Sequence, residues 1–208
     1  MTGRFITVEG GEGAGKSSNL AFIKDLLEKS GREVIFTREP GGTQLGEELR
    51  ELLLGHKHTG MSDDTELMLM FAARSDHLQQ VMKPALDTGH WVLCDRVTDA
   101  TYADQGGGRH IDQLRIAQLE NWVQGDLRPD LTLLLDLPVE TGLARAKSRS
   151  EPDRFESEKL QFFENVRHAY LDIAQNQPER VKVIDASQAL DKVQHQIQMV
   201  MQEYLKHD

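Results

Sequence analysis

Residues 5–17 read FITVEGGEGAGKS, an apolar run followed at once by a glycine-rich turn and the start of a helix. The turn matches the pattern G-x-x-x-x-G-K-S, whose glycines let successive N–H groups point inward around phosphate oxygens. Lys16 supplies a positive charge for the β- and γ-phosphates, and the Ser17 hydroxyl is a ligand for Mg²⁺. The stretch predicts a phosphate-binding loop (P-loop) for ATP, made of Gly10, Gly11, Glu12, Gly13, Ala14, Gly15, Lys16 and Ser17.

Short apolar runs alternate with longer amphipathic ones along the chain, which is typical of an α/β fold with a parallel sheet. The runs lack strict alternation, as expected for strands covered by helices on both faces. We expect five strands, at Phe5–Glu9, Glu33–Thr37, Trp91–Asp95, Leu131–Asp136 and Val181–Asp185. We expect helices at Lys16–Ser30, Leu45–Leu54, Asp63–Thr88, Asp112–Gly125, Val139–Ser148, Ser157–Gln175 and Leu190–Lys206.

Length and composition narrow the function classes. A chain of 208 residues suits one well-buried domain, so we expect a single domain over residues 1–208. The net charge of -10 argues against nucleic acid or an anionic membrane as a partner. No stretch approaches the ~18 apolar residues of a membrane span, and no secretory leader is visible. With Cys94 as the single cysteine, these features predict a cytoplasmic protein without an intrachain disulfide.

Charged side chains follow two strands of the expected sheet, at the edge where parallel sheets present their ligands. Arg38 follows the second strand and Arg96 the third. A guanidinium pairs with a phosphate through two parallel hydrogen bonds, so these arginines predict a site for a phosphorylated acceptor. Asp95, which ends an apolar strand, is a candidate for organising Mg²⁺ together with Ser17.

Several runs resemble bacterial thymidylate kinase, in order along nearly the whole chain. They are Gly10–Ser17, Arg38–Thr43, Phe71–Arg74, Asp95–Arg96, Gln105–Arg109, Asp126–Thr132 and Asp185–Ser187. The run Arg38–Thr43 is highly specific, whereas a P-loop alone serves many reactions. The resemblance implies a P-loop NTPase fold of the nucleoside-monophosphate-kinase type with a helical lid. It also implies transfer of the γ-phosphoryl of ATP to dTMP with Mg²⁺ as cofactor, usually by a homodimer.

The resemblance also implies roles for single residues. Arg38 and Arg96 would hold the acceptor phosphate, and Glu12 would reach the sugar 3′-hydroxyl. Arg74 would hydrogen-bond the thymine carbonyl, and the other polar edge of the base would face Thr101 and Gln105. The residues expected to be catalytic are Lys16, Arg96, Asp95 and Arg154.

Arg154 is chosen because it lies in the expected lid, about residues 148–158. Some family members carry an arginine inside the P-loop, at the position of Gly13, whereas this chain offers basic residues in and near the lid. These are Arg145, Lys147, Arg149 and Arg154. Charge that moves onto the transferring phosphoryl needs a cation, which the lid would then bring. A merely solvated charged loop is the alternative.

Three positions depart from the family pattern. The family stacks an aromatic residue on thymine at the position of Met70, so either Met70 or its neighbour Phe71 would cover the base here. Val97 replaces an aromatic residue or histidine, and Asp104 replaces a tyrosine that crowds the sugar 2′ position. A P-loop kinase of another nucleotide or nucleoside therefore remains an alternative. A nucleotide-gated regulatory protein is a second one, although Arg38 and Arg96 speak for an acceptor.

Overall fold

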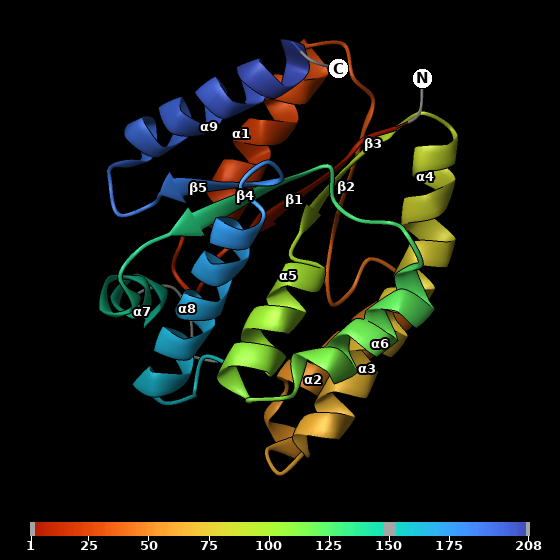
Figure 1. Cartoon of the computed structure of the whole chain (residues 1–208), viewed down its shortest axis with the longest axis vertical. Coiled ribbons are helices and arrows are strands. Elements are labelled where there is room, and N and C mark those ends of the chain that lie inside the picture. The colour runs from red at the N-terminus through yellow and green to blue at the C-terminus, as the bar shows by residue number, and fades with distance from the viewer. Residues whose placement is uncertain (1–2, 148–152, 207–208) are drawn as a thin grey trace.

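A computed structural model describes residues 3–147 and 153–206 (Figure 1). A five-stranded parallel sheet lies at its centre, in the order β2-β3-β1-β4-β5. The strands are β1 Phe5–Glu9, β2 Val34–Arg38, β3 Trp91–Asp95, β4 Leu131–Asp136 and β5 Val181–Asp185. The expected α/β architecture is confirmed, and only β2 differs from its expected bounds, by one residue. Because Val8 pairs with Asp95, the carboxyl ends of β1 and β3 lie side by side.

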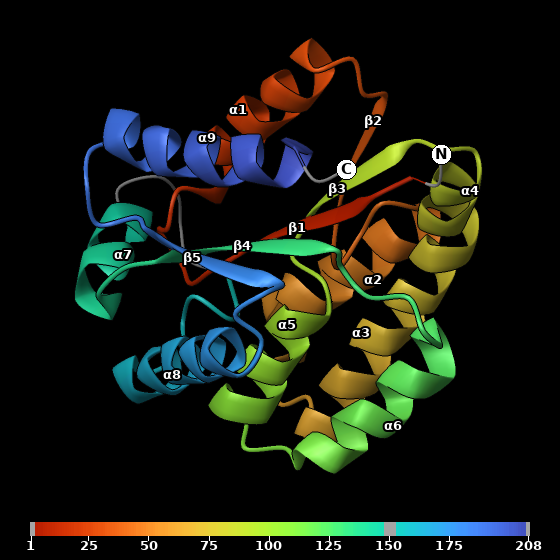
Figure 2. The same ribbon diagram turned by 45° about the horizontal axis from the view of Figure 1, so that its top comes forward.

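Helices cover both faces of the sheet (Figure 2). Helices α1 (Lys16–Lys29) and α9 (Leu190–Lys206) pack on one face, and α5 (Thr98–Thr101) and α8 (Leu160–Asn176) pack on the other. The other α-helices described are α2 Gln44–Leu54, α3 Asp63–His77, α4 Lys83–Asp87, α6 Gln113–Gln124 and α7 Val139–Lys147. None of the helices in the described ranges is both long and apolar enough to span a bilayer.

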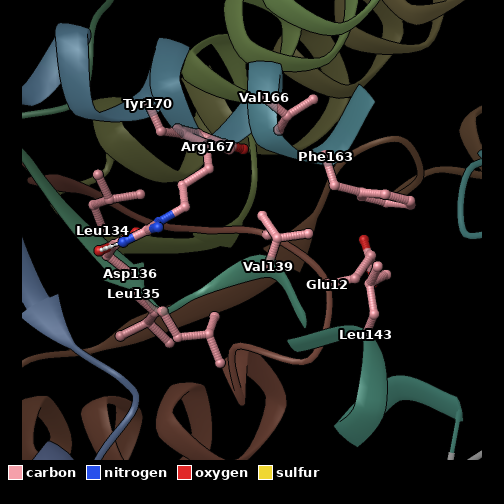
Figure 3. A pocket seen from close by; sticks show the side chains of 12 residues that line it. Glu12, Leu134, Leu135, Asp136, Val139, Leu143, Phe163, Val166, Arg167 and Tyr170 are labelled. Atoms are coloured by element: carbon pink, nitrogen blue, oxygen red, sulfur yellow. Dashed lines mark hydrogen bonds and ion pairs between the residues drawn. The ribbon is translucent and has the colours of Figure 1, made fainter. Parts of the chain in front are cut away.

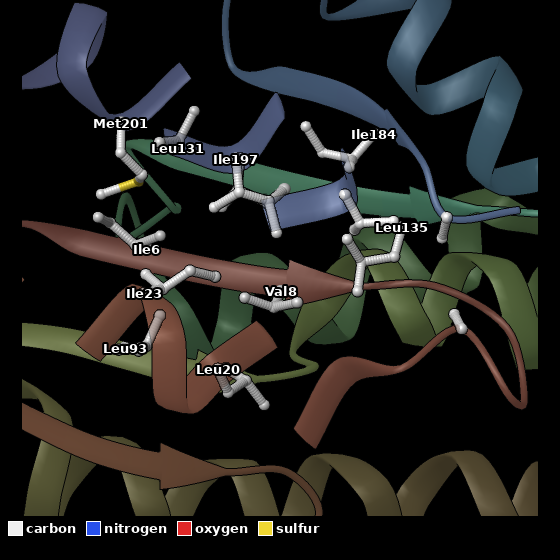
Figure 4. Close-up of a cluster of buried hydrophobic side chains, with 14 of the residues drawn as sticks. Ile6, Val8, Leu20, Ile23, Leu93, Leu131, Leu135, Ile184, Ile197 and Met201 are labelled. Atoms are coloured by element: carbon white, nitrogen blue, oxygen red, sulfur yellow. The ribbon is translucent and has the colours of Figure 1, made fainter. Parts of the chain in front are cut away.

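The largest core cluster fills the space between the sheet and helices α1 and α9 (Figure 4). It includes Ile6, Val8, Leu20, Ile23, Leu93, Leu131, Leu135, Ile184, Ile197 and Met201. Fully burying one such side chain contributes about 1.5–3 kcal/mol. Side chains alternate between the faces of a strand, so Ile6 and Val8 point into this cluster and Glu9 points toward the opposite face. The core therefore holds β1, and with it the start of the P-loop, rigidly in the middle of the sheet.

Residues 98–108 are helical where the sequence pattern predicts no helix. Helix α5 continues into a π-helical segment, Tyr102–Gly108, that packs against α8. A Cβ on Gly107 would lie 2.8 Å from the Ala169 Cβ, and one on Gly108 would lie 2.3 Å from the Phe162 ring. The glycines look like a loop in the sequence, but they permit close contact with α8, and such packing provides most helix stability.

The expected helix Asp63–Thr88 also contains a π-helical segment, Leu78–Met82, which joins α3 to α4. The expected lid falls partly outside the described residues, because 148–152, with Arg149, are not described. Residues 154–157 form a turn, 158 is a bend, and α8 begins at Leu160 instead of the expected Ser157. The described part of the lid is therefore an irregular segment that leads into α8.

Candidate active site

The P-loop connects β1 to α1 through backbone that favours glycine. Gly10, Gly13 and Gly15 have φ values of 140°, 68° and 83°. At Gly13 a Cβ would lie 1.9 Å from the Gly142 carbonyl oxygen of α7, so the loop and α7 are in direct contact there. Any residue other than glycine at these positions would have a strained backbone or a clashing Cβ. The local sequence thus curls the loop at the N-terminus of α1, where a helix dipole favours anions.

Lys16 lies against the loop that it belongs to. Its Nζ donates to the carbonyl oxygens of Gly10, at 2.9 Å, and Gly11, at 3.1 Å. Burial lowers the pKa of Lys16, and the positive charge of Arg96 lowers it further. An ammonium in this position is ready to exchange carbonyl partners for phosphate oxygens.

A cavity of about 180 Å³ opens at the mouth of the loop. It is lined by Glu12, Gly13, Ala14, Gly15, Lys16, Ser17, Ala146 and Glu156. Burial raises the pKa of Glu156, and the neighbouring Glu12 carboxylate raises it further. Lys16 is the only cation that the described residues contribute to this lining, so it is the group there that can neutralise a polyphosphate.

The main cleft, about 300 Å³, shares the P-loop as one wall. Its described lining brings together four cationic side chains. They are Lys16 at the start of α1, Arg38 at the end of β2, Arg50 on α2 and Arg96 directly after β3. The lining also includes apolar side chains, among them Leu54, Met70, Phe155, Phe162, Phe163 and Val166, and the carboxylates of Glu12, Glu39, Asp95, Asp104, Asp153 and Glu156. A cleft with several cations and several apolar side chains suits a molecule with an anionic group and a flat apolar part.

Arg96 lies deeper in the cleft than Arg38. Its guanidinium pairs with the carboxylate of Glu12 at 2.6 Å and with Asp104 at 3.4 Å, and its side chain is 18% exposed. Arg38 pairs with Glu47 at 2.7 Å and is half-exposed. Both sequence-predicted arginines therefore face one cleft, with Arg96 inside and Arg38 at its rim.

Asp104 faces the cleft as well, from the π-helical segment that carries Gln105. Burial raises the pKa of Asp104 to about 6, although Arg96 opposes the rise. Tyr102 does not fill this space, since its hydroxyl donates to Glu120 at 2.7 Å on α6. The departure noted in the sequence thus places a small acidic group beside Arg96 in the cleft.

Arg74 is buried and does not itself line the main cleft, although its partner Glu39 does. Its Nε donates to Glu39 at 2.7 Å, and one terminal nitrogen donates to the Thr101 hydroxyl at 2.8 Å and the Val97 carbonyl at 3.0 Å. The other terminal nitrogen, Nη1, is buried and has no hydrogen-bond partner among the described residues. An unsatisfied buried donor costs about 1–3 kcal/mol, so Nη1 is suited to a ligand acceptor.

Met70 and Phe71, the two residues expected to cover the base, lie in different surroundings. Met70 lines the cleft, but Phe71 is 2% exposed and packs in a core cluster with Leu67, Ile111 and Ile116. The Arg74 guanidinium stacks over the Phe71 ring, 4.7 Å from its centroid. Phe71 therefore lies on the face of α3 that packs in the core, and its ring supports the Arg74 guanidinium.

Thr101 and Gln105 are both buried, and Thr101 contacts Arg74. Gln105 Nε2 donates to Glu66 at 3.0 Å, so its amide is held from the side of α3. Glu66 is itself 1% exposed and also accepts from Arg109 and from Arg154, the latter at 2.6 Å. A buried carboxylate needs such partners, and Glu66 links α3, the π-helical segment and the lid.

The structure does not bring Arg154 to the P-loop. Its Nε donates to the Leu53 carbonyl at 2.7 Å, its other end pairs with Glu66, and the side chain is 7% exposed. Arg145 also points elsewhere, to the carbonyls of Ala186 and Ser187. The sequence could not predict that Glu66 is buried and that its ion pair holds Arg154 beside α3.

The donor set beside the loop fits a divalent cation. Asp95 Oδ1 is buried and has no hydrogen-bond partner within the described ranges. Asp95 and Ser17 line the same cleft, and hard cations such as Mg²⁺ prefer carboxylate and hydroxyl oxygens with several waters retained. These two residues, both predicted from the sequence, are the ones that would hold the ion.

Arg50 is a cleft residue that sequence reasoning missed. It donates to the Pro40 carbonyl at 2.9 Å, and burial, with the like charge of Arg38, lowers its pKa. Arg50 follows Thr43, the N-cap of α2, by seven residues, which is two helical turns. That spacing places it on the side of α2 that faces the Arg38–Thr43 loop, and it is the signal that could have revealed it.

A separate cavity of about 30 Å³ lies behind the P-loop (Figure 3). Leu134, Leu135, Val139, Leu143, Phe163, Val166 and Tyr170 form most of its wall. At one side Arg167 pairs with Asp136 through two hydrogen bonds of 2.7 and 2.9 Å. The main cleft, at about 300 Å³, is far larger, and this cavity is too small for a nucleotide.

Comparisons with known proteins agree on one family. The family model described as thymidylate kinase matches residues 8–197. A thymidylate kinase of Pseudomonas putida is 58% identical over 97% of this chain and 96% of that protein, and one of Alcanivorax borkumensis is 53% identical over 98% of both. The crystal structure of thymidylate kinase from Ehrlichia chaffeensis superposes with a TM-score of 0.79 at 33% identity, covering 97% of this chain and 99% of that one.

Proposed function

The chain belongs to the thymidylate kinase family, and from this premise we propose how its residues share the transfer of the γ-phosphoryl of ATP to dTMP. The observation that carries the proposal is the wall common to two cavities. The loop-mouth cavity and the main cleft share Glu12, Lys16, Ser17 and Glu156. A donor phosphate chain in the first and an acceptor phosphate in the second would meet at Lys16, as in-line transfer requires.

The donor side is assigned to the P-loop, residues 10–17. Its N–H groups and Lys16 would bind the β- and γ-phosphates, and Lys16 would neutralise charge as the phosphoryl moves. Ser17 and Asp95 would hold Mg²⁺, which, when bound, shields the phosphate oxygens and orients them. The orphaned oxygen of Asp95 supports this assignment.

The acceptor side is assigned to the main cleft. Arg96, with Arg38 and Arg50 at the rim, would bind the phosphate of dTMP, and Glu12 would reach the sugar hydroxyl. Met70 would cover the base, and Arg74 Nη1 would donate to a thymine carbonyl. Arg154 is assigned to this side too, where it braces Glu66 and Gln105.

A panel of acceptors tests the function directly. ADP release, followed by a coupled assay, should be fastest with dTMP and much slower with dUMP, UMP, dCMP and thymidine. Thymidine lacks the phosphate that Arg96 would bind, so it separates nucleotide from nucleoside kinases. A preference for thymidine or UMP over dTMP would contradict the assignment.

Asp104 is expected to loosen the choice between deoxyribose and ribose. It lies beside Arg96 in the cleft and lacks the bulk of the tyrosine that the family places there. Asp104→Tyr should raise the preference for dTMP over its ribose counterpart about tenfold, since one hydrogen bond to a charged group is worth about 1.5–3 kcal/mol. The measurement is kcat/KM for both nucleotides.

Asp104→Asn is the matched control, because it keeps the size of the side chain and removes its charge. If bulk sets the selectivity, Asn should behave like Asp. If the charge does, Asn should behave like Tyr. An unchanged ratio in Asp104→Tyr would count against any role of Asp104 in sugar choice.

We also propose a cytoplasmic homodimer formed through α3 and α6, as one domain with its lid over about residues 148–158. Met68, Leu114 and Trp122 are 57%, 71% and 85% exposed on these neighbouring helices. A continuous apolar patch built from these side chains would be typical of an association surface. Trp122→Glu should therefore halve the mass measured by light scattering.

Leu190→Glu is the control for this change, because Leu190 is similarly apolar and 51% exposed but lies on α9. It should leave the mass unchanged. A wild-type protein with the mass of a single chain would contradict the dimer.

A further inference from the structure

Arg96 has a left-handed backbone conformation, with a φ of 63°, that is unfavourable for residues other than glycine. A left-handed residue brings its Cβ close to a carbonyl oxygen, so the conformation persists only where the surroundings hold it. Arg96 directly follows β3, and its left-handed backbone turns the chain there. This turn determines the direction in which the Arg96 guanidinium points away from the sheet. Whatever holds the turn therefore determines where the acceptor phosphate is bound.

Two consecutive residues at the end of β1 hold the turn. The Arg96 N–H donates to the Val8 carbonyl at 3.1 Å, and the Val97 N–H donates to Glu9 Oε1 at 2.8 Å. These N–H groups belong to the peptides on either side of the Arg96 Cα. Both rotations of the Arg96 backbone are thus tied to β1, one by main chain and one by the Glu9 side chain.

Glu9 is fixed in turn from the opposite side. Its other oxygen, Oε2, accepts from the Tyr170 hydroxyl at 2.9 Å. Tyr170 projects from α8 toward the sheet (Figure 3), and Glu9 and Tyr170 are 0% and 3% exposed. Glu9 does not line the main cleft, and both of its carboxyl oxygens already have protein partners.

We propose that Glu9 is a positioning residue for the acceptor phosphate, acting through the Arg96 turn and held by Tyr170. The proposal rests on the assignment of Arg96 to that phosphate. A carboxyl at this position reaches both the Val97 amide and a hydroxyl from α8. An apolar side chain would pack in the same space but leave the Val97 N–H without its acceptor.

The protonation state of Glu9 shows which replacement preserves its role. Burial and the negative charge of Asp99 together raise the pKa of Glu9 to about 8, so the carboxyl is mostly neutral near pH 7. In this neutral form Oε1 still accepts from the Val97 N–H. The contact between Oε2 and the Tyr170 hydroxyl can then also run in the reverse direction, with the protonated Oε2 donating to the Tyr170 oxygen. Glutamine has the same shape and the same two functions, whereas leucine has neither.

Steady-state kinetics of Glu9→Leu, Glu9→Gln and the wild type test the proposal. A misplaced binding group can cost about 10²-fold, so Glu9→Leu should raise KM for dTMP by about 10- to 100-fold. KM for ATP should stay within about twofold, because the loop itself is unchanged. Glu9→Gln should restore KM for dTMP to within about threefold of the wild-type value. Equal increases for both substrates, or a failure of glutamine to rescue, would overturn the proposal.

A double-mutant cycle with Arg96→Ala shows whether Glu9 acts through Arg96. In the Arg96→Ala background, Glu9→Leu should have almost no further effect on KM for dTMP. Additive effects would overturn the proposal while leaving the assignment of Arg96 intact. If Arg96→Ala alone leaves KM unchanged, the assignment itself fails.

Tyr170→Phe keeps the aromatic packing and removes only the hydroxyl, so it serves if Glu9→Leu does not fold. It should raise KM for dTMP about threefold to tenfold with KM for ATP unchanged. An unaltered KM for dTMP would show that the contact with α8 does not position Arg96.

Discussion

Replacing Lys16 with alanine should lower the rate of phosphoryl transfer by about 10³-fold or more, with the fold preserved. Loss of a single preorganised group that stabilises transition-state charge typically costs about 10²–10³-fold. Lys16 is the only cation among the described residues of the loop-mouth cavity, and the carboxylates of Glu12 and Glu156 face the same space. No neighbouring cation in that lining can substitute for it.

The fold should survive because helix α1 is held by its buried face. Leu20, Ile23 and Leu27 are fully or nearly fully buried, whereas Lys16 contributes only contacts to its own loop carbonyls. Turnover by coupled ADP release and thermal unfolding by circular dichroism measure the two effects separately. Lys24→Ala is the control, since Lys24 is an exposed lysine of the same helix in a surface pair with Glu28. Near-wild-type turnover in folded Lys16→Ala would remove Lys16 from the mechanism.

Arg96→Ala should weaken the use of dTMP by about 3 kcal/mol, which is about 10²-fold in KM, while KM for ATP changes little. The phosphate would lose a largely buried guanidinium. It would also face Glu12 and Asp104 without the cation that now pairs with both. The second effect adds repulsion, so the loss should exceed that of a simple ion pair.

Two variants sharpen this prediction. Arg38→Ala should cost only about 1 kcal/mol, because Arg38 is half-exposed and solvent screens its charge. Arg96→Lys keeps the charge but loses the planar pair of donors, so its KM for dTMP should lie between those of the wild type and Arg96→Ala. Equal losses for ATP and dTMP in Arg96→Ala would place Arg96 on the wrong side of the site.

The P-loop and the sheet could be predicted from sequence because their causes are local. A strand, a glycine turn and a helix start within residues 5–17, and the glycines themselves provide the positive φ values that the loop needs. Short apolar runs between longer amphipathic ones mark the parallel strands. The positions of Arg38, Asp95 and Arg96 followed directly, since strand ends meet at one edge of a parallel sheet.

Contacts between distant elements could be known only from the tertiary structure. Phe71 and Met70 are neighbours with similar apolar side chains, and only the packing of α3 turns Phe71 into the core and Met70 into the cleft. In the sequence Arg154 resembles the other basic residues of the lid, and only the structure shows that it pairs with Glu66, 88 residues away in the chain. Gly107 and Gly108 form part of a helix because α8 approaches them closely.

Glu9 illustrates the same division. By itself the sequence determined that a glutamate precedes the P-loop, at the end of a strand whose other side chains are mostly apolar. The tertiary structure alone decided that this carboxyl meets Val97 and Tyr170, 88 and 161 residues further along the chain. Local patterns record the backbone path of each element, whereas the partner of a buried polar group depends on how all the elements pack together.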